Sequence, residues 1–111
     1  MREQPVAVIA IVAEEGFRLT LEDLCRAAAV SPAWIIERVQ CGLIEAHGAS
    51  EDAVDRAAHE AWHFDAQVLR RVRSMRRIEL GFGAEPELAA LVADLEGEVA
   101  RLRELLQLAR H

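Results

Sequence analysis

The hydrophobic positions near the N-terminus change their spacing along the chain. The run from Val6 to Ala13 is apolar and rich in β-branched residues, which predicts a buried strand. Beyond it the apolar residues recur at helical spacing, and Thr20 followed by Asp23 is typical of a helix N-terminus. The sequence therefore predicts a strand, a turn at residues 14–16 and a first helix. The inward positions of that helix are Leu21, Leu24, Cys25 and Ala28.

A second helix is predicted after a short turn at residues 29–31. Ser31 is a favourable N-cap, and Pro32 suits the first helical position because no amide hydrogen is needed there. The helix extends to Cys41, and Gly42 supplies a left-handed stop. Two short helices joined in this way predict a helix-turn-helix. Ile35, Val39 and Leu43 form the expected inner face.

The middle of the chain is polar before it becomes a strand and a third helix. Residues 46–59 are small and polar, and a short helix could begin at residues 50–52. Trp62 and Phe64 alternate with the polar residue between them, as on a short strand. Asp65 then caps a helix over residues 66–80 that Gly81 ends. The inward positions of this helix are Val68, Leu69, Val72, Met75 and Ile78.

The last helix, opened by Pro86, carries the clearest pattern. Six apolar residues step by 4, 3, 4, 3 and 4 positions, which is a heptad repeat. A stripe this narrow favours a partner helix, so we expect a coiled-coil homodimer; the alternative is that the helix folds onto its own domain. Leu91 and Leu105 widen the apolar stripe. The six positions, named here the leucine seam, are Leu88, Val92, Leu95, Val99, Leu102 and Leu106.

Composition narrows the classes of function. The chain has 111 residues, enough for one domain, and a net charge of −6 with 13 arginines and no lysine. An acidic protein is repelled by nucleic acid unless its positive charge is concentrated on the docking face. No apolar run has the length that a membrane-spanning helix needs. None is followed by the cleavage site that a secretory signal would show. Two cysteines inside helical patterns, Cys25 and Cys41, fit reduced core residues of a cytoplasmic protein.

One enzymatic motif occurs, and its context argues against it. His59, Glu60 and His63 match H-E-x-x-H, which on a helix binds zinc with the glutamate as general base. Here the pattern changes from helix to strand between the two histidines, and only Glu79 or Glu85 lies downstream at a plausible distance for a third ligand. We therefore expect no catalytic residues, no metal site and no cofactor.

The order of these parts resembles a known family. The residues that carry the likeness are Phe17–Leu24, Ala29–Ser31, Gly42–Ile44, Trp62–Asp65, Leu69–Arg71 and Leu80–Phe82, which are similar to MerR-type domains. The resemblance implies a mainly α fold with a short N-terminal strand and a small wing. It implies a winged helix-turn-helix domain over residues 1–82, followed by a long coiled-coil dimerisation helix over residues 83–111.

A narrower likeness is to the chaperone-modulator family CbpM. It is carried by Val30–Glu37, by Gly48–Ser50 and by the pair Trp62 and Phe64. The resemblance implies binding to the J-domain of a DnaJ-type, CbpA-like co-chaperone and inhibition of its co-chaperone and DNA-binding activity. The segment over residues 46–63 is longer than is usual in the family, and the N-terminal strand is additional.

The second helix decides between a protein partner and DNA. A recognition helix reads bases with cations or amides, yet its outward positions Ala33, Ile36, Glu37 and Gln40 offer one amide, one carboxylate and no cation. Such a face suits a basic protein, with apolar anchors and a carboxylate for steering. The predicted partner-binding residues are Trp34, Ile36, Glu37, Arg38 and Gln40. The other possibility is that Trp34 is a core residue and the acids are solvated surface.

A cluster of arginines on the third helix is the evidence for the alternative, a MerR-type DNA-binding regulator. Five arginines in eight positions form a basic patch that could contact phosphates. We favour the simpler explanation that these arginines form a solvated helix face that pairs with the chain's many acids. The patch consists of Arg70, Arg71, Arg73, Arg76 and Arg77. The candidate nucleic-acid contacts are Arg70, Arg71, Arg73 and Arg77.

Overall fold

The structure, a computed structural model, describes residues 18–48 and 59–110 of the chain. In this part the protein is mainly helical with one two-stranded antiparallel sheet. Its elements in chain order are β1 (Leu19–Thr20), α2 (Leu21–Ala28), α3 (Pro32–Gln40), β2 (His63–Phe64), α5 (Ala66–Phe82) and α6 (Pro86–Ala109). The predicted strand over residues 6–13 lies outside the described residues. Most of the short helix predicted from residue 50 lies outside them as well.

Each helix begins where a short polar side chain or a proline predicts it. Thr20 and Asp23 form a reciprocal capping box at α2, and the hydroxyl of Ser31 accepts a hydrogen bond from the amide of Trp34 at α3. Asp65 accepts from the amide of Val68 at α5. Satisfying these amides at the helix ends removes a cost that would otherwise oppose each helix start.

Left-handed residues end the first three helices. Gly42, at φ 80°, follows α3, and the bonds Leu43 N–Arg38 O and Gly42 N–Val39 O complete a Schellman motif. Ala29, the C-cap of α2, is also left-handed with φ 59°, although a Cβ makes this conformation unfavourable. The predicted end of α5 at Gly81 is wrong: the helix extends to Phe82, and Gly83 at φ 64° is the left-handed cap.

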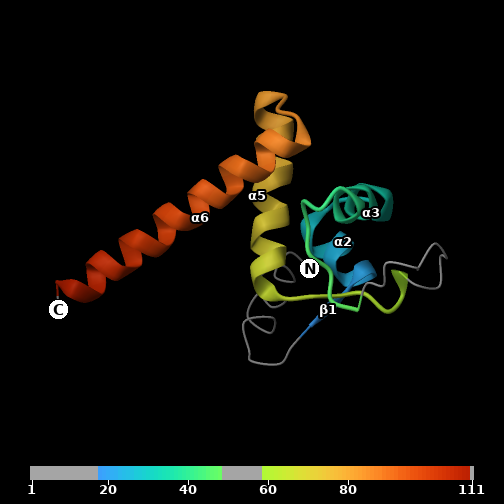
Figure 1. Cartoon of the computed structure of the whole chain (residues 1–111), viewed down its shortest axis with the longest axis horizontal. Helices are drawn as coiled ribbons and strands as arrows, with labels where there is room; N and C mark the ends of the chain where they lie inside the picture. Colours follow the sequence, from blue (N-terminus) through green and yellow to red (C-terminus); the bar gives the residue numbers. More distant parts are fainter. Residues whose placement is uncertain (1–17, 49–58, 111) are drawn as a thin grey trace.

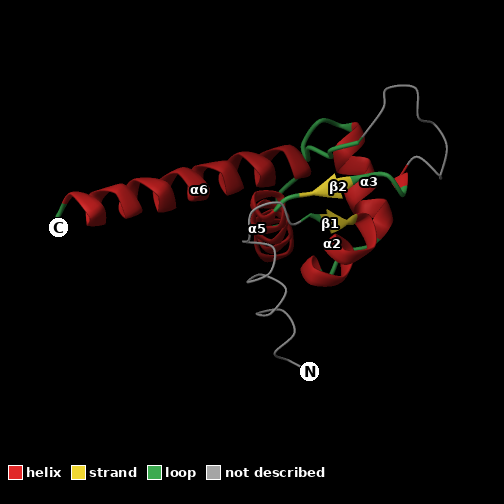
Figure 2. Cartoon of the chain, turned by 90° about the horizontal axis from the view of Figure 1, so that it is seen from below, coloured by secondary structure: helices red, strands yellow, loops and turns green. Residues whose placement is uncertain are grey.

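The small sheet joins residues far apart in the sequence. Leu19 pairs with Phe64 and Thr20 with His63, while His47 forms an isolated bridge to the other side of His63. Leu19 and Phe64 point into the core, whereas Thr20 and His63 point to solvent. The alternation of His63 and Phe64 was predicted from the sequence. β1 therefore pairs with the strand before α5 (Figure 2).

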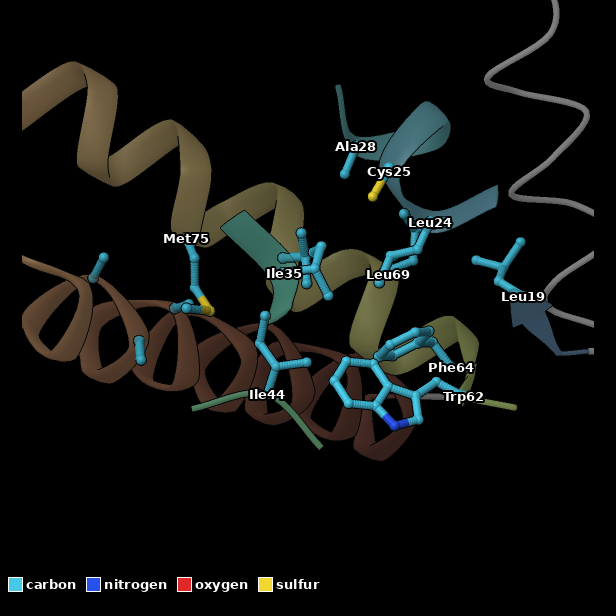
Figure 3. Packing of buried hydrophobic residues seen from close by; sticks show 14 of the residues in the cluster. Leu19, Leu24, Cys25, Ala28, Ile35, Ile44, Trp62, Phe64, Leu69 and Met75 are labelled. Carbon is cyan, nitrogen blue, oxygen red and sulfur yellow. The ribbon is translucent and has the colours of Figure 1, made fainter. Parts of the chain in front are cut away.

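The core lies where α2, α3 and the sheet meet α5. Ile35, Leu69 and Phe64 are fully buried in it, and Trp62 packs edge-on to Phe64 (Figure 3). The inward positions predicted for α5 are buried, except that Val68 is half-buried. Val39 and Leu43, predicted for the inner face of α3, are half-buried, while Ile35 is inside.

Helix α6 packs on α5 only near its start and then leaves the body (Figure 1). Ala89, Ala90 and Ala93 are buried, and every described residue from Asp94 onward is exposed. Small side chains allow the two helices to approach closely. The first two turns of α6 therefore belong to the core rather than to a separate dimerisation segment beginning at residue 83.

Candidate functional site

The exposed side of α3 carries most of the residues predicted to bind a partner. Glu37 and Gln40 are exposed, with 69% of the Glu37 side chain accessible. Trp34 and Ile36 are half-buried and pack against the edge of the core. The surface formed by Trp34, Ile36, Glu37 and Gln40, named here the α3 face, therefore combines apolar area with one carboxylate.

Arg38, predicted as a partner-binding residue, does not lie on this face because its side chain is buried. Its side chain is only 6% exposed and meets Glu79 of α5, itself 14% exposed, through bonds of 3.1 Å from Nε and 2.7 Å from Nη2. Glu79 lies 41 positions away in the sequence, so helical spacing on α3 could not reveal this partner.

Arg38 also contacts two members of the α3 face from its buried position. Its Nη1 donates to the backbone carbonyl of Trp34 at 3.1 Å and to Oε1 of Glu37 at 3.2 Å. The guanidinium carbon lies 3.7 Å from the centre of the Trp34 ring, a cation–π contact. One buried cation thus joins α5, the Trp34 ring and the Glu37 carboxylate.

Some arginines of the α5 patch form ion pairs with acidic residues of α6, and others are exposed. Arg71 bonds to Asp94 of α6 at 2.6 Å and to the carbonyl of Leu43. Arg77 bonds to Glu96 at 2.6 Å. Arg70 and Arg73 are exposed. Two of the four candidate nucleic-acid contacts are therefore neutralised by carboxylates of α6, which weakens the patch as a site for phosphates.

Five of the six residues of the leucine seam face solvent. Leu88, Leu95, Val99, Leu102 and Leu106 are between 45% and 62% exposed, whereas Val92 is half-buried and packs against the core. At 3.6 residues per turn the five exposed side chains project from the side of α6 opposite Ala93 and Gly97. The alternative that the seam folds onto its own domain therefore disagrees with the structure, because α6 uses its alanines for that contact.

Two exposed hydrophobic residues at the junction of α5 and α6 were missed by the sequence analysis. Leu80 is exposed, and Phe82 is 79% exposed at the last position of α5. Leu91, on the first turns of α6, is also exposed. The sequence contained a signal for Phe82, because this residue fits none of the inward positions of the helix. The predicted helix end at Gly81 placed Phe82 in a loop instead.

An open cleft of about 880 Å³ separates α5 from the part of α6 that diverges from it. Half-buried Leu43 and Val68 lie among its lining residues. Six carboxylates line it against three arginines: Glu45, Asp65, Asp94, Glu96, Glu98 and Glu104 against Arg70, Arg71 and Arg101. This surplus of negative charge disfavours a polyphosphate ligand.

The histidines of the H-E-x-x-H match do not share a helix face. His59 packs its ring on Trp62 with centroids 4.6 Å apart, whereas His63 lies in β2. Nε2 of His47 lies 3.8 Å from Oδ2 of Asp65. In residues 18–48 and 59–110 no group of three potential metal ligands converges. The geometry that a zinc protease needs is therefore not formed by these side chains.

The two cysteines differ in environment. Cys25 is buried in the core, as predicted, and burial raises the pKa of its thiol, with a further contribution from the charge of Glu22. Cys41, in contrast, is exposed at the C-cap of α3, so its prediction as a core residue is wrong. The helical pattern placed it correctly near a helix end but could not show which side faces the core.

No protein family, curated protein or solved structure matches this chain. None of the helices in the described part of the chain has the length and apolar character needed to span a bilayer.

Proposed function

We propose that the protein is a chaperone-modulator adaptor of the CbpM type. It binds the J-domain of a DnaJ-type, CbpA-like co-chaperone in the cytoplasm and inhibits that protein's co-chaperone and DNA-binding activity. It acts as a homodimer and catalyses no reaction. In this proposal α2 and α3 form the helix-turn-helix of a MerR-like winged domain, and α6 forms the coiled coil.

The observation that carries the proposal is the inward position of Arg38. This residue is the only cation of α3, and its bonds to Glu79 remove it from the surface. The exposed side of α3 is left with one carboxylate, one amide and no cation, so it has no positive charge to attract a phosphate. Half-buried Trp34 and Ile36 beside Glu37 instead suit a protein surface that carries basic residues.

Dimerisation is supported by the exposed leucine seam. A contiguous stripe of exposed leucines and valines is costly in water, and such patches typically mark interaction sites. The heptad spacing matches the requirement of a second helix of the same kind. The alanine contact of α6 with α5 leaves this stripe accessible.

A titration of the full chain with an isolated J-domain tests the proposal. We expect saturable binding, and Glu37→Arg should weaken it about tenfold because it places a cation against a basic partner. Glu22→Arg, on α2 and outside the α3 face, is the matched control and should bind as the parent does. Undetectable binding of the parent protein, or equal losses for both variants, contradicts the proposal.

The second candidate is a MerR-type DNA-binding regulator. The observation that favours it is the exposure of Arg70 and Arg73 on α5. Titration with duplex DNA at low salt distinguishes the two functions: tight binding with a steep salt dependence supports the regulator and argues against the adaptor.

A further inference from the structure

Arg38 is connected to more groups than a simple ion pair between two helices requires. Nε and Nη2 bind the Glu79 carboxylate, while Nη1 binds both the Trp34 carbonyl and the Glu37 carboxylate. The guanidinium also lies against the Trp34 ring at 3.7 Å. The two side chains that give the α3 face its aromatic anchor and its charge are therefore both held by the same buried cation.

Stability alone is a weak reason for this arrangement. Removing two charges from water is costly, and replacing a buried ion pair by apolar residues of similar volume is often neutral or stabilising. An apolar pair at positions 38 and 79 could join α3 to α5 equally well. It could not make the cation–π contact with the Trp34 ring, which requires a positive charge, or donate a hydrogen bond to Oε1 of Glu37.

We infer that Arg38 is a positioning residue for partner binding: anchored by Glu79, it fixes Trp34 and Glu37 in the conformation that the partner recognises. The inference rests on the proposed function and adds how the side chains of the α3 face are held in place. The matching partner surface presents a cation to Glu37 beside apolar side chains for Trp34 and Ile36. Because both groups are ordered before binding, the entropic cost of association is lower.

The test uses the double variant Arg38→Met/Glu79→Met in the full chain. Removing both charges together leaves no buried ion unpaired, so we expect its unfolding transition and its oligomeric state to match the parent protein. Its affinity for an isolated J-domain should fall about tenfold, because Trp34 and Glu37 are no longer held. Glu79→Gln, which keeps the volume and loses the charge, should weaken binding to a lesser extent.

A partner-independent measurement distinguishes positioning from a merely structural role. The chain has two tryptophans, and Trp62→Phe leaves Trp34 as the only fluorophore while removing a buried indole N–H that has no hydrogen-bond partner in the described structure. In that background, acrylamide quenching of Trp34 should increase when Arg38 and Glu79 are replaced. Adding Glu37→Gln to the double variant should then cost less affinity than Glu37→Gln costs alone, since both changes act through one contact.

The outcomes separate this inference from the proposed function. If the double variant binds the J-domain like the parent while Glu37→Arg still weakens binding, the proposed function stands and the positioning role of Arg38 is overturned. Unchanged quenching of Trp34, or additive effects of the Glu37 and Arg38 changes, also overturns it. If the parent protein does not bind a J-domain, both proposals fall.

Discussion

Ala93 and Leu95 lie two positions apart on α6 and point to opposite sides of the helix: Ala93 is 6% exposed against α5, and Leu95 is 56% exposed. The first side joins α6 to its own domain through small residues, and the second presents the leucine seam to solvent. One helix thus carries two contact surfaces, which can be tested separately.

A charge in the leucine seam should abolish the dimer. Leu95→Asp places a carboxylate at the centre of the proposed interface, where it is buried without a counter-ion. We expect a monomer in sedimentation velocity at concentrations where the parent is dimeric. Gln107→Asp introduces the same group on the other side of α6 and should leave the dimer intact. A dimeric Leu95→Asp protein contradicts a coiled coil through this seam.

Enlarging a residue on the opposite side should instead destabilise the domain. Ala93→Leu adds three carbon atoms where α6 approaches α5, and overpacking of this kind costs about 1–3 kcal/mol of unfolding free energy. Ala100→Leu, seven positions later on the same side but exposed, should change stability by less than about 0.5 kcal/mol. Urea denaturation measures both. Equal effects of the two variants would mean that α6 does not pack on α5 through its alanines.

The Arg38–Glu79 pair predicts a difference between single and double variants. Glu79→Ala removes the buried carboxylate that binds Arg38, leaves only the exposed Glu37 carboxylate against its cation, and should lower the unfolding free energy by about 3 kcal/mol. Replacing both residues by methionine should change it by less than about 1 kcal/mol. Chemical denaturation of the three proteins measures the comparison. A double variant as unstable as Glu79→Ala is the contrary result.

The two cysteines should react at very different rates with a thiol reagent. The raised pKa of Cys25, caused by burial and by Glu22, lowers its thiolate fraction at any given pH, and burial also restricts access. Cys41 is exposed, so one equivalent of thiol should be modified rapidly in mildly alkaline buffer and the second only on unfolding. Cys41→Ser should eliminate the fast phase, and persistence of that phase in the variant contradicts the assignment.

Local signals predicted much of the secondary structure. Thr20, Ser31 and Asp65 begin helices for reasons contained in their own side chains, since each accepts a backbone hydrogen bond three residues later. Helical spacing also predicted the buried residues of α5. The end of α5 was wrong because Gly81 and Gly83 carry the same local signal, and only the observed backbone shows which of them is left-handed.

The candidate site was only partly predictable. Glu37 and Gln40 are exposed as expected, because their positions relative to Ile35 follow from the helical repeat. The ion pair of Arg38 could not be predicted, because its counter-ion Glu79 belongs to another helix. The same reason applies to Arg71 and Arg77, whose acidic partners lie on α6.

The sequence by itself determined where helices begin and which stripe of α6 is apolar, since both depend on interactions within a few positions of the chain. Only the tertiary structure decided that α6 contacts its own domain through alanines, that the seam remains exposed and that the one cation of α3 is buried. These features depend on contacts between side chains that are far apart in the sequence. The spacing of residues within one helix contains no information about such contacts.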